Sequence, residues 1–117
     1  MTQSQVQQTF HIKQHDTDPN LYFTVYDGDT PVDLTTALSV RFLMSSLSHG
    51  LVINNSSNVT LFDQTLHPGE GTYRFQVGDT DISVEFKAEI EITWAGSRRQ
   101  TWPSKGYIKV KIAPDLG

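Results

Sequence analysis

Two histidines near the start of the chain have the residue type and spacing of metal ligands. His11 and His15 are four positions apart, and Asp16 and Asp18 follow them. On a helix, residues at i and i+4 share a face and can bind one ion. The surrounding pattern favours a strand, in which four residues span about 13 Å at ~3.3 Å per residue, too far for a shared ion. We therefore expect a solvated loop after the strand, with a weak cation site as the alternative.

Two acidic pairs resemble fragments of a calcium-binding loop. Asp27 and Asp29 form one pair, and Asp79 and Asp81 form the other. An EF-hand loop requires further oxygen ligands at fixed offsets and a glutamate at its twelfth position. Neither pair has these ligands, so we expect acidic turn residues and no metal site.

Three glutamates on one expected strand face are the remaining candidates for acid–base chemistry: Glu85, Glu89 and Glu91. Glycoside hydrolysis needs two carboxylates on either side of a cleft. If the last two strands pair, Lys109 and Lys111 lie near these glutamates, and cross-strand ion pairs explain them without an active site.

The chain also lacks the motifs of nucleophilic and nucleotide-binding sites. It has no cysteine, no G-x-S-x-G elbow, no Walker A loop and no dinucleotide fingerprint. His49 and His67 lie among turn residues. We therefore expect a protein that is not an enzyme and uses no cofactor.

The elements that position these residues are strands, because apolar side chains recur at every second position. From Glu85 to Trp94 every even position is apolar and every odd position is polar. Successive strand residues point to opposite faces, so this pattern buries one face of a strand, whereas on a helix the same residues would scatter around the axis. No stretch of ten residues has convincing helical periodicity.

The same alternation predicts further strands, punctuated by glycine and proline turns. The expected strands are Val6–Ile12, Leu21–Tyr26, Ser39–Met44, Leu51–Ile53, Val59–Phe62, Thr72–Val77, Glu85–Trp94 and Tyr107–Ile112. Seven or eight short strands at this spacing predict an all-β, immunoglobulin-like β-sandwich of antiparallel strands, with a small barrel as the alternative. We expect one domain over residues 1–117, with residues 1–5 as a flexible tail.

Composition restricts the class of protein further. The net charge is -4, from nine Lys and Arg against thirteen Asp and Glu. This balance argues against nucleic-acid binding, which usually requires a basic surface. We find no signal peptide at the N-terminus and no apolar run of the ~20 residues that cross a membrane. The expectation is a soluble protein made in the cytoplasm, with no nucleic-acid or membrane partner.

Outward aromatic and basic residues are the candidates for a protein interface. Tyr22 and Tyr26 fall on the strand face opposite Phe23. Trp102 precedes a proline, and Arg98 and Arg99 fall in an expected turn. Aromatic and arginine side chains often anchor interfaces. The expected interface residues are Tyr22, Tyr26, Arg98, Arg99 and Trp102, with local packing of the aromatic rings as the alternative.

An ordered set of turn and strand motifs resembles a known family. The set comprises Leu21–Tyr26, Asp27–Thr35, Val40–Phe42, Pro68–Phe75, Phe86–Ile90, Gly96–Pro103 and Tyr107–Ile112. This order resembles the N-terminal immunoglobulin-like domain of the phage baseplate upper protein, and the small tail and baseplate proteins of tailed bacteriophages that consist of that domain alone. The resemblance covers roughly Val6 to Ile112. The chain stops at Gly117, without the helical segment and receptor-binding-protein anchor that follow the domain in the baseplate protein.

The resemblance implies a structural role in the virion. The chain would be a tail or baseplate subunit whose partners are other phage tail or baseplate proteins, and it would form a symmetric homo-oligomer in the particle. A different class of function, a carbohydrate-binding or adhesion module, would use Tyr22, Tyr26 or Trp102 to stack on a sugar.

Overall fold

The computed structural model describes residues 9–117, which form an all-β structure. The strands are β1 (Thr9–Lys13), β2 (Leu21–Thr24), β3 (Tyr26–Asp27), β4 (Thr30–Pro31), β5 (Ser39–Ser46), β6 (Gly50–Asn55), β7 (Val59–Leu61), β8 (Glu70–Tyr73), β9 (Glu85–Trp94), β10 (Arg98–Trp102) and β11 (Ile108–Ala113). Within the described range the only helical element is the short 3-10 turn Ala95–Ser97. No helix in this range is long and apolar enough to cross a membrane. The expected tail, residues 1–5, and the start of the expected strand at Val6 lie outside the described residues.

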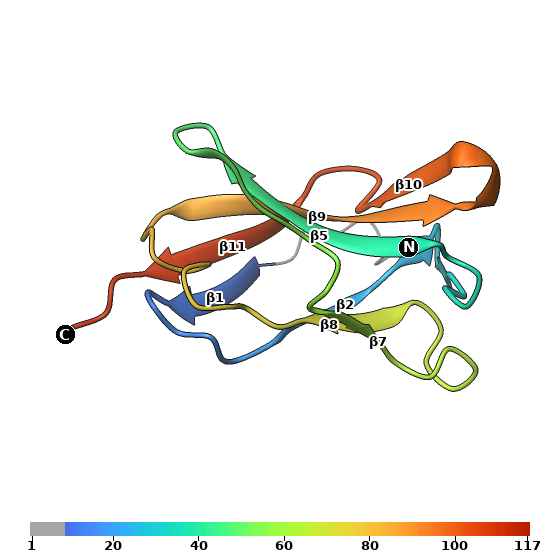
Figure 1. The fold of residues 1–117 in the computed structure, drawn as a ribbon, viewed down its shortest axis with the longest axis horizontal. Helices are drawn as coiled ribbons and strands as arrows, with labels where there is room; N and C mark the ends of the chain where they lie inside the picture. The colour runs from blue at the N-terminus through green and yellow to red at the C-terminus, as the bar shows by residue number, and fades with distance from the viewer. Residues whose placement is uncertain (1–8) are drawn as a thin grey trace.

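The strands form two main sheets that lie one above the other in Figure 1. The larger sheet has six strands in the order β1-β11-β9-β5-β6, and β10 also pairs with β9. The smaller sheet has the order β2-β8-β7, and β3 and β4 form a separate hairpin. The expectation of an all-β sandwich is confirmed at the level of its layers and strand content.

Strand β9 is the centre of the larger sheet because three strands pair with it. β5 runs antiparallel along one side, with Phe42 opposite Ile90. On the other side, β11 pairs with the first half of β9 and β10 with the second half. Four of its five alternating apolar residues are buried, as predicted: Phe86, Ala88, Ile90 and Ile92. The fifth, Trp94, is half-buried.

Aromatic rings form much of the core between the sheets. The ring of Phe42 from β5 stacks on Tyr73 from β8 at a centroid distance of 4.3 Å. Phe75 meets Tyr73 edge to face at 5.1 Å. All three side chains are almost fully buried. Such aromatic pairs stabilise a fold by about 0.5–1.5 kcal/mol beyond the area they bury, and here they join the two layers.

One strand pair contradicts the expectation that all strands are antiparallel. β1 runs parallel to β11, with Thr9 opposite Lys109 and Lys13 opposite Ala113. The alternation of a single strand shows which face is buried, but it carries no information on the direction of the neighbouring strand. The sheet is therefore mixed.

Two expected element boundaries were also wrong. The strand expected over Thr72–Val77 is β8, which ends at Tyr73, and Val77 is 95% exposed. Arg98 and Arg99 were expected in a turn, but they belong to β10, which pairs with β9. Pro103 lies between β10 and β11.

Candidate interface surfaces

Tyr22 lies on the outer face of the smaller sheet, as the sequence predicted. Its side chain is 65% exposed. The register places it opposite Thr72, which in turn lies opposite Thr60 on β7. Because strand residues alternate between faces, these three residues share the face directed away from the core. The row formed by Tyr22, Thr72 and Thr60 across the smaller sheet therefore contains no charged residue.

Tyr22 belongs to a cluster of three rings that we call the Tyr22 patch: Tyr22, Phe62 and His67. Phe62 meets Tyr22 edge to face at 5.9 Å, and His67 meets Phe62 at 6.0 Å. His67 also lies 3.4 Å from the carboxylate of Glu70. Sequence reasoning did not identify Phe62 and His67 as members of a cluster with Tyr22. The aromatic residue at the end of the expected strand Val59–Phe62 was the available signal.

Tyr26 is less accessible than Tyr22. It is half-buried, packs against the hydrophobic core and pairs with Pro31 in the β3–β4 hairpin. The geometry therefore favours local packing for Tyr26 and does not bring it into the Tyr22 patch.

Arg98 and Arg99 are exposed on β10, in the other sheet from Tyr22. Arg99 lies 3.9 Å from the carboxylate of Glu91, so its charge is partly engaged within the chain. Arg98 has no ion pair among residues 9–117 and lines a hollow of about 370 Å³ with Trp94 and Gln100. Arg98 is therefore the freer of the two cations for a partner's carboxylate.

Trp102 does not form part of an exposed surface, which corrects its prediction as an interface residue. It is 1% exposed and pairs with Ile90, a residue of the core face of β9. Its indole Nε1 has no hydrogen-bond partner among the described residues. Trp102 is a core side chain and cannot stack on a sugar or a partner without unfolding.

Two of the three glutamates of β9, Glu85 and Glu91, take part in ion pairs. Glu91 is 9% exposed and accepts a hydrogen bond from the Arg41 guanidinium. Burial, followed by the charge of Glu91, raises the pKa of Glu89 above its ordinary value. Glu85 lies 4.0 Å from Lys111, as expected from strand pairing. Cross-strand ion pairs thus account for Glu85 and Glu91, but not for Glu89.

Lys109 departs from the expected pairing with glutamates. The register of β9 and β11 places it opposite Lys87. Lys87 in turn lies over the ring of Tyr107, with its Nζ 5.0 Å from the ring centroid. This cation–π contact offsets part of the repulsion between the two lysines.

His15 lies in the segment expected to be a solvated loop, with a weak cation site as the alternative, and its side chain is 56% exposed and contacts two carboxylates. His15 lies after β1, and its Nδ1 is 3.0 Å from the carboxylate of Asp115 and its Nε2 3.8 Å from that of Asp81. The hydrogen bond to Asp115, helped by the charges of Asp115, Asp81 and Asp16, raises the pKa of His15. Among the described residues, no three His, Asp or Glu side chains are placed to hold a metal ion.

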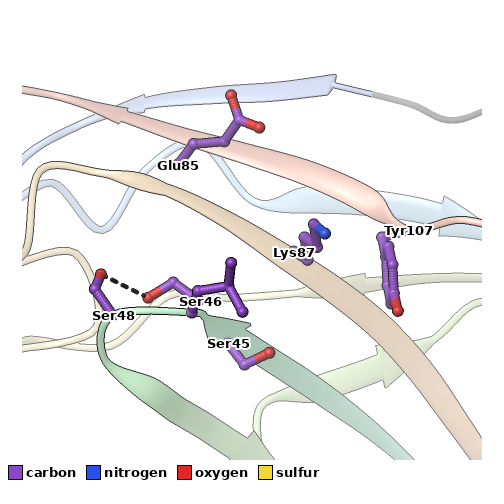
Figure 2. Close-up of a pocket in the computed structure, with 7 residues that line it drawn as sticks. Ser45, Ser46, Ser48, Glu85, Lys87 and Tyr107 are labelled. Carbon is purple, nitrogen blue, oxygen red and sulfur yellow. Dashed lines mark hydrogen bonds between the residues drawn. The ribbon is translucent and has the colours of Figure 1, made fainter.

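A shallow hollow lies on the outer face of the larger sheet, near the β5–β6 hairpin. Its volume is about 440 Å³, and its lining includes hydroxyls, a cation and an aromatic ring: Ser45, Ser46, Ser48, Glu85, Lys87 and Tyr107. Figure 2 shows Lys87 beside Tyr107, with Glu85 and the linked Ser46 and Ser48 farther along the hollow. The same Lys87 contact covers part of the Tyr107 ring, so this ring is only partly available for stacking.

No protein-family model, curated protein or solved structure matches this chain.

Proposed function

We propose that the chain is an immunoglobulin-like structural subunit of a tailed-bacteriophage tail or baseplate and acts through protein–protein contacts in the virion. The observation that carries this proposal is the ordered set of motifs from Leu21 to Ile112. In this proposal the protein is not an enzyme, its partners are other tail or baseplate proteins, and symmetry repeats its contacts around the particle.

The geometry of these motifs supports a structural role for their residues. Gly28 has a φ of 62° in the turn between β3 and β4, a conformation that glycine adopts without strain. Asp33 Oδ1 accepts a hydrogen bond from the Thr35 amide at 2.9 Å, and Leu34 between them is buried. Gly69 lies against the β2–β3 connection, where a Cβ would be 2.5 Å from the Val25 carbonyl oxygen. Motif residues thus form turns and close approaches.

The Tyr22 patch supports the assembly role. Tyrosine buries a large area at low entropic cost, and such residues often dominate interface energetics. Thr72 and Thr60, in the same row as Tyr22, are uncharged, so a partner that covers them does not have to remove water from a charged group. We infer that this face contacts a neighbouring virion protein.

Mass spectrometry of purified virions, together with electron microscopy, tests the proposal. The polypeptide is expected in the particle at a copy number that matches a symmetric ring. Tyr22→Ala is expected to lower the yield of assembled particles, whereas Tyr26→Ala at the half-buried ring serves as the comparison for general loss of packing. Absence of the polypeptide from the particle would contradict the proposed function.

A carbohydrate-binding module is the second candidate, and the hollow of Figure 2 favours it. Three serine hydroxyls, Glu85, Lys87 and the Tyr107 ring are the group types that bind sugars. A glycan array distinguishes the two candidates: a hit abolished by Tyr107→Ala but retained in Tyr22→Ala supports sugar binding at this hollow. Trp102→Ala is unsuitable because that side chain is buried in the core.

A further inference from the structure

The outer edge of β6 is a strand edge without charged residues or proline. β6 closes one side of the six-stranded sheet and pairs with β5 alone. A strand paired on one side leaves backbone N–H and C=O groups free for another strand, and natural proteins usually block such edges with charge or proline. From Phe42 to Phe62 the sequence contains no Asp, Glu, Lys, Arg or Pro. Neither charge nor proline therefore blocks this edge.

A β-bulge turns apolar side chains of β6 toward solvent. The register shifts between Met44 and Ser45, so that Met44 lies opposite Ile53 and Ser45 opposite Leu51. Without this shift, Leu51 would share the buried face of Ile53, two residues away. Instead Leu51 is 58% exposed and Val52 is 38% exposed, while Ile53 is buried.

The β5–β6 hairpin is also accessible. Figure 1 shows its loop projecting beyond the two sheets at the top left. Leu47 at this loop is fully exposed. Among residues 9–117, β6 pairs with β5 alone, and β7 pairs with β8 in the other sheet.

Charge separates β6 from the other free edges of the larger sheet. Two identical strands that pair across a two-fold axis run antiparallel, so each charged residue of the strand is present twice in the pair. Self-pairing at β1 would place two copies of Lys13 in one strand pair, and self-pairing at β10 would place four arginines there, from Arg98 and Arg99. Charged side chains on an edge strand oppose such pairing, and β6 has none. The other uncharged edges, β2 and β7, have four and three residues, against six in β6.

We propose that β6 pairs with β6 of a second copy of this chain in an antiparallel, two-fold arrangement. The two larger sheets then form one continuous sheet. Leu47, Leu51 and Val52 bury apolar surface at the junction, and the free backbone groups of both edges form hydrogen bonds. An edge contact of this length lies below the ~1,200 Å² of standard interfaces, so the dimer is weak and concentration-dependent. The inference does not depend on the proposed function.

Sedimentation equilibrium of the purified chain tests this pairing. Between about 10 µM and 1 mM the weight-average mass is expected to rise from monomer toward dimer, as for a weak interface. Val52→Lys places two like charges at the junction and is expected to weaken association about tenfold or more. Val77→Lys makes the same chemical change at a side chain that is 95% exposed in another loop, and it should leave association unchanged.

Hydrogen–deuterium exchange of the unmodified chain gives a second measurement that needs no variant. The amides of Gly50–Asn55 are expected to exchange more slowly at 1 mM than at 10 µM, while those of β10 stay unchanged. A chain that is monomeric throughout, a dimer unaffected by Val52→Lys, or protection at another edge would each overturn the proposal. None of these results would bear on whether the chain is present in virions.

Discussion

The hydroxyl of Tyr73 allows one hydrogen bond to be removed from the core without disturbing the aromatic stack. It donates a 2.6 Å hydrogen bond to Asp79 Oδ2, which also accepts the Gln76 amide at 2.8 Å. The Tyr73 ring is fully buried and stacks on Phe42. Burial and then the hydrogen bond to Asp79 raise the pKa of Tyr73, so the hydroxyl remains a donor through the neutral range.

Tyr73→Phe is expected to lower the free energy of unfolding by about 1.5 kcal/mol. Hydrogen bonds to charged groups contribute ~1.5–3 kcal/mol. The lower end applies because Asp79 is half-buried, keeps the Gln76 bond and can be hydrated. For a domain of this size, about 4 °C per kcal/mol gives a fall in Tm of about 6 °C. Urea and thermal unfolding followed by circular dichroism measure both quantities.

Tyr22→Phe is the matched control, because it removes the same atom from a side chain that is 65% exposed. Its effect should stay within about 0.5 kcal/mol. A double-mutant cycle with Asp79→Ala should give a coupling energy of roughly 1 kcal/mol between the two side chains. If Tyr73→Phe changes stability no more than Tyr22→Phe does, the assigned role of this hydrogen bond is wrong.

Three further predictions concern the backbone, the contact between His15 and Asp115, and the core. In urea unfolding, Gly69→Ala should destabilise the fold by several kcal/mol more than Gly28→Ala. Both glycines have a positive φ, which costs an alanine ~1–2 kcal/mol. Only at Gly69 would the added Cβ also clash with a backbone oxygen, at 2.5 Å. Because the pKa of His15 is raised in the folded chain, its contribution to stability is complete below the unfolded value of 6.5 and is lost as the pH rises through the folded value. In an NMR titration, Asp115→Asn should move the pKa of His15 back toward 6.5. An unchanged titration would show that Asp115 does not interact with His15 as described. Trp102→Phe removes the unpartnered indole N–H and should cost only about 1–2 kcal/mol, against ~3–5 for Trp102→Ala, and equal costs in denaturant titrations would contradict this account.

The alternation of apolar and polar residues predicted the two layers well, because the burial of one strand face produces this pattern. Phe86, Ala88, Ile90 and Ile92 are buried as the alternation of β9 indicated. β10 was missed because its sequence, Arg98–Trp102, contains a single apolar residue and is held by pairing with β9. When pairing with a neighbour stabilises a strand, its own sequence need not show the alternation of apolar residues that predicts a strand.

The candidate interface was only partly predictable, because exposure depends on partners that lie far away in the sequence. Tyr22 was expected outward and is outward, since a clear alternation surrounds it. Trp102 was expected outward but is opposite Ile90, and its burial follows from a register that no local pattern gives. Phe62 and His67 join Tyr22 only because β7 and β2 both pair with β8.

The parallel pair of β1 and β11 also affects the order in which a newly made chain can fold. Thr9 pairs with Lys109 and Lys13 with Ala113, so the strand made early finds its partner only after residue 113 has been synthesised. Contacts so distant in sequence form late and slowly. Until then β1 has an unpaired edge, and the nascent chain is exposed to wrong pairing. A chain truncated before Ile108 would leave β1 without its partner and the first half of β9 unpaired on one side. Such a chain should therefore be unfolded throughout, and not merely lack one strand.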